Sequence, residues 1–206
     1  MNRCVIIGGA DITKYDLIKS HLREDDFYVF CDSGLKHLAA LEVKPDLIVG
    51  DFDSYTNPNL EVETIVLPCE KDDTDTVFAV KEMIKRGAKE FLVIGAIGAR
   101  LDHTLGNVGI LSMLHAKGLK GSIIDDYSEM EIISGGPNWV EDNYSFFSLL
   151  NISGEAEGIS IKNAKYPLEN AEITCEYQYG VSNEVLPGKT AEISISSGKL
   201  LLIKVF

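Results

Sequence analysis

The chain has 206 residues, of which 45% are hydrophobic, and carries 19 Lys and Arg against 32 Asp and Glu, a formal net charge of −13. This length can bury a core without disulfide or metal staples, and it suits one large domain or two small ones. The acidity excludes a broad nucleic-acid surface and an anionic membrane surface, both of which need clustered Lys and Arg, and leaves a metal site or a cationic substrate open.

No targeting or membrane segment is expected. The longest nearly apolar run, 91–99, is far shorter than the ~20 residues of a membrane span. The amino-terminal apolar run meets Asp11 at once, which is typical of a first strand rather than of a signal peptide. The four cysteines are widely spaced with no CxxC pair, so we expect free thiols, no zinc site and a cytoplasmic protein.

Apolar runs alternate with helical patterns over residues 1–134. The predicted strands are 4–7, 28–31, 47–49, 63–67, 91–94, 122–125 and 129–133, and the predicted helices are 15–22, 34–41, 76–86 and 101–115. The apolar stripes expected to face the core in the last two helices are Val77, Val80 and Ile84, then Leu105, Val108, Leu111 and Leu114. Apolar strands separated by helices indicate an α/β domain with a mostly parallel sheet covered on both faces.

After Gly135-Gly136-Pro137 the apolar period changes to two. The predicted strands are 145–152, 158–162, 171–179, 190–196 and 199–206, with a hairpin turn at 197–198. Residues 140–206 are therefore predicted to form a small all-β antiparallel sandwich domain. Because so small a domain is marginal alone, we expect it to pack against the first domain or a second subunit.

The first chemical motif is Gly50-Asp51-Phe52-Asp53-Ser54, which directly follows a predicted strand. Two carboxylates at the carboxyl end of a parallel strand suit a hard cation such as Mg²⁺, which takes oxygen ligands and is often shared with phosphates. An Asx turn leaving the strand is the structural alternative, and for this motif alone it is the more frequent one.

The second motif is Lys71-Asp72-Asp73-Thr74-Asp75, just before a predicted helix. A helix N-cap and the helix dipole explain one or two of these acids, but not three in four positions behind a lysine. Because the acids would repel one another without a counter-charge, the two motifs together favour a divalent metal, with Lys71 reaching a phosphate.

The third motif, residues 95–103, again follows a predicted strand. Its glycines allow close backbone approach, and Arg100 offers a planar fork for phosphate. Asp102 is open to an N-cap role, and His103 to a general-base role or, more often, a structural or solvated one. No GxxxxGK[ST] loop and no GxGxxG fingerprint is present, so metal and side chains would hold the phosphates.

The second half offers one candidate binding group, in the two turn-like segments 165–170 and 180–184. The ring of Tyr166 can stack on a flat or cationic ring, and Ser182 and Asn183 can bond to ring nitrogens. Spacing alone favours the alternative, ordinary turn residues beside a half-buried tyrosine.

The order of motifs resembles the bacterial thiamine pyrophosphokinase family over essentially the whole chain. The segments that carry the resemblance are GDFDS (50–54), EKDDTD (70–75), GxRLDHTLxN (98–107), KYPLEN (165–170) and GVSN (180–183), with CDSG (31–34) and PD (45–46) before them. The resemblance implies an ATP-binding catalytic domain, 1–134, followed by a thiamine-binding and dimerisation domain, 140–206. It also implies Mg²⁺-dependent transfer of pyrophosphate from ATP to the hydroxyl of thiamine, giving thiamine diphosphate and AMP.

The resemblance also implies roles for single residues and a homodimer that holds thiamine between the α/β domain of one subunit and the β domain of the other. The implied metal ligands are Asp51, Asp53 and Asp75, with Asp72 near them, and the implied catalytic residues are Asp51, Asp53, Asp75 and Arg100. The implied binding residues are Asp32 in the CDSG segment, Lys71 on the phosphate side, Asp102 near thiamine, and Tyr166, Ser182 and Asn183 on the β-domain side of the thiamine pocket.

The chain departs from the family pattern at Ala99, where a second glycine is expected, and at Asn163-Ala164, which replaces a Gly-Leu pair. Two other functions stay open from the residues alone. One is a related metal-dependent transferase with another alcohol acceptor, such as a pterin. The other is a thiamine- or nucleotide-binding protein without turnover, although binding alone does not need so many metal ligands.

Overall fold

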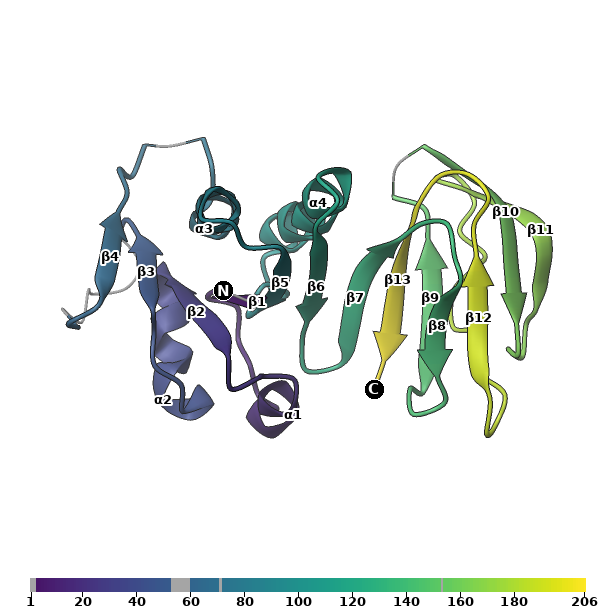
Figure 1. The fold of residues 1–206 in the computed structure, drawn as a ribbon, viewed down its shortest axis with the longest axis horizontal. Coiled ribbons are helices and arrows are strands. Elements are labelled where there is room, and N and C mark those ends of the chain that lie inside the picture. Colours follow the sequence, from purple (N-terminus) through teal and green to yellow (C-terminus); the bar gives the residue numbers. More distant parts are fainter. Residues whose placement is uncertain (1–2, 53–59, 71, 153) are drawn as a thin grey trace. The chain divides into compact units, whose positions relative to one another are not determined.

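The computed structural model describes residues 3–52, 60–70, 72–152 and 154–206 (Figure 1). Contacts divide the chain into two compact units, residues 1–126 and 127–206. The predicted fold class is confirmed, with a mostly parallel α/β sheet in the first unit and antiparallel strands in the second. Among the described residues, no helix has the length and apolar character that a membrane-spanning segment requires.

The strands of the first unit pair in parallel in the order β4–β3–β2–β1–β5–β6. Residues 4–7 of β1 are fully buried, which follows from helices covering both faces of the sheet. The bounds are β1 (Arg3–Ile7), β2 (Asp26–Cys31), β3 (Leu47–Gly50), β4 (Glu63–Val66), β5 (Glu90–Ile94) and β6 (Lys120–Ile124).

Strands β1 to β4 follow one another outward to one edge of this sheet. Strand β5 then pairs with the other side of β1. The connections that follow β1 and β5 therefore leave the sheet edge in opposite directions and open a crevice between them. Ligands of open α/β sheets bind at such a switch point, outside the carboxyl ends of the strands.

Two layers of helices flank the sheet: Figure 1 shows α3 and α4 above its strands and α1 and α2 below them. The bounds are α1 (Tyr15–Ser20), the 3₁₀ helix η1 (Asp32–His37), α2 (Leu38–Leu41), α3 (Asp75–Lys85) and α4 (Leu101–Ala116). Helix α3 buries Val80 as predicted, with Ala79 and Met83 beside it. Helix α4 buries Ile110, Leu111 and Leu114 but leaves Leu105 63% exposed, so the predicted stripe is wrong in its first turns.

The second unit consists of two antiparallel sheets, β7–β13–β9 and β11–β10–β12–β8. Side chains from both sheets, among them Phe147, Ile159 and Leu202, form one apolar core. The bounds are β7 (Ser128–Ile133), β8 (Asn138–Glu141), β9 (Phe146–Leu150), β10 (Glu155–Lys162), β11 (Leu168–Thr174), β12 (Thr190–Ser194) and β13 (Leu200–Val205).

Strand β7, expected at the end of the first domain, groups with the second unit. The reason is its pairing, because all six of its residues lie opposite β13 at the end of the chain. Strand β8 is not among the predicted strands, since its four residues, Asn138–Glu141, contain only one buried side chain, Val140.

Candidate active site at the carboxyl edge of the parallel sheet

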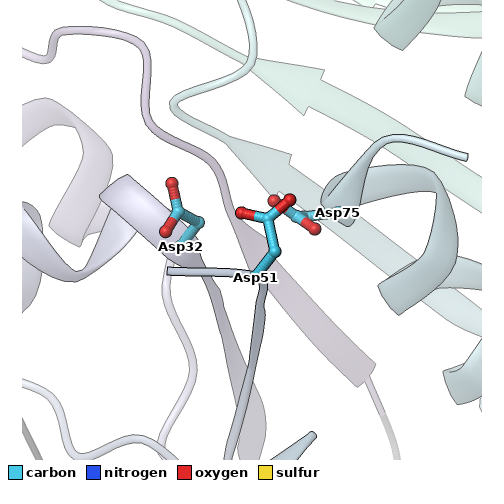
Figure 2. A group of neighbouring side chains, drawn as sticks. All are labelled: Asp32, Asp51 and Asp75. Atoms are coloured by element: carbon cyan, nitrogen blue, oxygen red, sulfur yellow. The ribbon is translucent and has the colours of Figure 1, made fainter. Parts of the chain in front are cut away.

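Three aspartates lie together at the carboxyl edge of the parallel sheet. Asp32 begins η1 directly after β2, Asp51 directly follows β3, and Asp75 begins α3. One carboxylate oxygen of each lies within 4.8 Å of the others, and Figure 2 shows the three side chains converging. The two acidic motifs of the sequence thus meet in space, and the structure adds Asp32 to them.

Local backbone features bring Asp32 and Asp51 together. Strands β2 and β3 are parallel neighbours, with Cys31 opposite Val49, so the residues that follow them leave the same edge. A Cβ atom on Gly50 would lie 3.1 Å from the Cα of Asp32, so glycine permits this close approach. Asp32 itself has a φ of +40°, a conformation that aspartate tolerates better than most residues.

Asp75 is placed by the start of α3. Thr74, not an aspartate, is the N-cap, and its side-chain oxygen accepts a hydrogen bond from the Val77 amide at 3.3 Å. Asp75 therefore lies in the first helical turn, where the helix dipole favours a negative charge. The Asp73 carboxylate instead binds Lys81, whose Nζ donates to both of its oxygens at 2.7 Å.

The three carboxylates fit a hard divalent cation. Asp32 is only 7% exposed, so solvent screens the repulsion within the group poorly. An all-oxygen, anionic donor set is the one that Mg²⁺ prefers, and Mg²⁺ completes its shell with water or phosphate oxygens. On the chemistry of the donor set, these residues fit the metal that the resemblance implies.

Two cavities open beside the carboxylates. One, of about 320 Å³, is lined by all three aspartates together with Arg100 and His103. The other, of about 380 Å³, lies at the switch point, between the loops after β1 and β5 and the amino end of α4. Arg100 and His103 line both cavities. A ligand that extends from one cavity to the other would therefore bring one end to the carboxylates.

Backbone forms much of the wall at the switch point. Gly95 has a φ of +61°, and a Cβ atom there would lie 2.3 Å from the carbonyl oxygen of Gly8. Only glycine fits this position, because both the conformation and the approach exclude a side chain. The loops after β1 and β5 thus lie in contact at the floor of the crevice.

Arg100 forms a bidentate ion pair with Asp102, with N–O distances of 3.0 and 2.6 Å. Hydrogen bonding from Arg100 holds the pKa of the Asp102 carboxyl well below its usual range. Asp102 lies in the first turn of α4, whose N-cap is Arg100, so Asp102 is not the N-cap. Arg100 lines both cavities, and its guanidinium is a group that can bind a phosphate there.

The candidate residues of the second unit lie next to one another. Asn183 is buried, and its Oδ1 accepts a hydrogen bond from the Tyr166 amide at 3.0 Å while its Nδ2 donates to the Tyr166 carbonyl at 2.8 Å. The Tyr166 side chain is 58% exposed, and Ser182 is exposed with a φ of +59°. Asn183 thus fastens the loop that presents the Tyr166 ring.

Family comparisons agree with this two-part organisation. A family model described as "Thiamin pyrophosphokinase, catalytic domain" matches residues 18–123, more than half of the chain. A second, "Thiamin pyrophosphokinase, vitamin B1 binding domain", matches residues 140–200. The chain belongs to the thiamine pyrophosphokinase family.

Individual members of the thiamine pyrophosphokinase family match along the whole chain. Thiamine pyrophosphokinase of Bacillus subtilis (strain 168) is 26% identical over 208 residues, covering 97% of this chain and 96% of the relative. The crystal structure of the Bacillus subtilis protein has a TM-score of 0.87 at 23% identity, with 100% of this chain and 99% of that chain covered. Thiamin pyrophosphokinase from Geobacillus thermodenitrificans has a TM-score of 0.81 at 26% identity, covering 99% of this chain and 97% of that one.

Three residues that the family resemblance singles out do not appear in the carboxylate group. Two of them lie outside the described residues, and one lies elsewhere. Asp53 and Lys71 lie outside the described residues. Asp72 is exposed and is not a member of the group formed by Asp32, Asp51 and Asp75. The roles predicted for these residues stay predictions.

Sequence patterns did not reveal two charged residues of the cavity wall. Lys36 on η1 and Asp11 in the loop after β1 both line the switch-point cavity, and they form an ion pair at 2.6 Å. They are 25 residues apart in the chain and belong to no motif. Only the approach of η1 to the loop after β1 makes them neighbours.

Proposed function

We propose that this chain transfers the pyrophosphoryl group of ATP to the hydroxyl group of thiamine and releases thiamine diphosphate and AMP. Family membership supports the choice of reaction. The observation that carries the proposal is the group of Asp32, Asp51 and Asp75, within 4.8 Å of one another beside cavities at the switch point of the sheet. Phosphoryl-type transfer needs positioning and charge neutralisation of this kind more than covalent chemistry.

The residues proposed to hold Mg²⁺ are Asp32, Asp51 and Asp75. When bound, the metal would neutralise charge on the phosphate oxygens of ATP and hold them for transfer. Asp53, from the same motif as Asp51, remains a predicted ligand.

The chain's own residues supply the other parts of the reaction. The thiamine oxygen forms a bond to the β-phosphorus, while the bond from that phosphorus to the α–β bridging oxygen breaks and AMP leaves. Arg100 would bind phosphate oxygens as charge develops on them, because its guanidinium reaches both cavities. The hydroxyl proton would pass to a carboxylate, and the acidic wall would also favour the cationic thiazolium ring.

Thiamine recognition is proposed to involve the second unit. Tyr166 is exposed and its ring is available for stacking, while Asn183, which follows Ser182 in the chain, fastens the loop. Following the resemblance, we propose a homodimer in which thiamine binds between the first unit of one copy and the second unit of its partner.

The test is an acceptor panel with purified protein, ATP and Mg²⁺. Thiamine, a hydroxymethyl pterin and a no-acceptor control are incubated separately, and products are separated by chromatography. We expect thiamine diphosphate from thiamine and no product from the pterin. Product from the pterin alone would show that a pterin, and not thiamine, is the acceptor. Saturable thiamine binding without any product would indicate a binding protein.

A further inference from the structure

His37 is a buried histidine that the proposed reaction does not use. It ends η1, the element that begins with Asp32, and it is only 2% exposed. Its Nε2 lies 2.8 Å from the carbonyl oxygen of Ala10, and its Nδ1 lies 2.8 Å from the hydroxyl oxygen of Tyr15 on α1. Both ring nitrogens are therefore in use.

The Ala10 carbonyl defines the proton on one ring nitrogen, and burial decides the other. A carbonyl oxygen only accepts, so Nε2 carries the proton and donates to Ala10. The Tyr15 hydroxyl can donate or accept, and because a charged ring would be buried at a cost, we assign a neutral imidazole whose Nδ1 accepts from Tyr15. Burial lowers the pKa of His37 and outweighs the hydrogen bond to Ala10, which raises it; the nearby Lys36 charge also lowers the pKa, and Asp11 raises it.

The carbonyl that His37 holds belongs to the wall of the switch-point cavity. Ala10 lines that cavity, and its amide donates to the Gly95 carbonyl at 2.8 Å, which ties the loop after β1 to the loop after β5. Its Cβ also faces Gly98, where an added Cβ would lie 2.9 Å away. Ala10 is thus held by its carbonyl on one side and by its amide on the other.

The far end of the same loop has a separate anchor. Asp126 accepts hydrogen bonds from the amides of Thr13 and Lys14 at 2.8 and 2.9 Å. Between this anchor and β1, two side-chain contacts from η1 hold the loop, the His37 hydrogen bond and the exposed ion pair of Lys36 and Asp11. Because His37 is buried, its bond is the one shielded from water.

We propose that His37 is a positioning residue of the switch-point cavity. As a neutral imidazole between Tyr15 and Ala10, it fixes the part of the cavity wall that the loop after β1 forms. The inference rests on the proposed function in taking ATP as the ligand of that cavity. Loss of the imidazole would weaken ATP binding and leave the thiamine side unchanged.

The test compares four variants in steady-state kinetics and in calorimetric titration with ATP and Mg²⁺. His37→Leu removes both hydrogen bonds, Tyr15→Phe removes one, and His37→Gln keeps a donor for Ala10. The matched control is Tyr28→Phe, because the Tyr28 hydroxyl donates to the Arg23 carbonyl at 3.3 Å and lines neither cavity.

We expect the KM for ATP to rise about tenfold in His37→Leu and about threefold in Tyr15→Phe, which corresponds to the loss of ordinary hydrogen bonds. His37→Gln should recover part of the loss, and Tyr28→Phe should match the wild type. The KM for thiamine should stay within about twofold throughout. Nitrogen-15 NMR of the wild type at pH 7 should show a neutral His37 protonated at Nε2.

An unchanged ATP affinity in His37→Leu, an equal rise of both KM values, or a charged ring at pH 7 would overturn the inference. If His37→Leu does not fold, Tyr15→Phe and His37→Gln decide by the same criteria. If the wild type binds ATP but makes no thiamine diphosphate, the proposed function fails while the calorimetric affinities still test His37. A wild type that binds no ATP would overturn both.

Discussion

Negative charge is concentrated on three residues of the cavity wall. Asp32, Asp51 and Asp75 have oxygens within 4.8 Å of one another, and such groups repel when no cation lies between them. A bound cation would remove this repulsion, which supports the functional role proposed for the three carboxylates.

Replacing Asp75 by asparagine should therefore separate activity from stability. We expect Asp75→Asn to lower kcat/KM by about 100-fold or more, because one anionic ligand is lost where charge develops. The free energy of unfolding without metal should be unchanged or higher, since repulsion is relieved. Steady-state kinetics with a Mg²⁺ titration, and urea unfolding, measure the two effects.

Asp73→Asn is the matched control for this substitution. It makes the same chemical change two residues away, on a carboxylate that is bound by Lys81. Its activity should stay close to that of the wild type. Full activity of Asp75→Asn, or equal losses in the two variants, would remove the metal role from Asp75.

The pH dependence of stability should report the neutral state of His37. Burial lowers the pKa of His37 below its ordinary value, so below about pH 6.5 the unfolded chain binds a proton that the folded chain does not. The free energy of unfolding should thus fall as the pH drops from about 7 to about 5. Urea titrations of the wild type and His37→Leu across this range should show a smaller drop in the variant, and equal slopes would contradict the assignment.

At the scale of elements, the site depends on how closely η1 approaches β1. A Cβ atom on Gly34 would lie 2.3 Å from the Ile7 carbonyl oxygen, and η1 also contains Asp32, Lys36 and His37. One added methyl group would displace the element that supplies both a carboxylate and a wall of the switch-point cavity.

Gly34→Ala should therefore cost about 1–3 kcal/mol of stability, as overpacking does, and lose most of the activity. Gly106→Ala on α4 is its control, because the added Cβ would meet no heavy atom within 4 Å apart from the adjoining backbone of its own helix. That variant should gain about 0.5–1 kcal/mol through helix propensity and stay active. Urea unfolding and a product assay check both, and a fully active Gly34→Ala would show that η1 tolerates displacement.

The alternation of elements could be predicted from the sequence, and so could the acidic motifs after β3 and before α3. The position of Asp32 next to these motifs could not be predicted from the sequence. It follows from the pairing of β2 with β3 and from the φ of +40° at Asp32. The stripe predicted for α4 failed at Leu105 because the first turns of that helix lie at the exposed edge of the site. Strand β7 could be predicted as a strand, but its partner β13 lies some 70 residues away along the chain.

At the scale of the whole molecule, the proposed dimer predicts complementation between inactive variants. Asp75→Asn alters the first unit, and Tyr166→Ala alters the second and should raise the KM for thiamine more than that for ATP. If each site combines units from two copies, a mixed dimer holds one doubly altered site and one intact site. Co-refolding the two variants should therefore restore activity at low thiamine concentration.

The same mixture distinguishes other arrangements. If each site lies within one copy, every site of a mixed dimer carries one substitution and no activity returns. Each variant refolded alone gives the baseline activity. The mass in solution shows whether a dimer exists. A monomeric mass would contradict the proposed dimer.

The reaction itself is tested most directly by phosphorus-31 NMR of one mixture that contains the purified chain, ATP, Mg²⁺ and thiamine. Attack at the β-phosphorus predicts that ATP resonances give way to those of AMP and thiamine diphosphate in equal amounts. Resonances of ADP and thiamine monophosphate would show attack at the γ-phosphorus and would contradict pyrophosphoryl transfer.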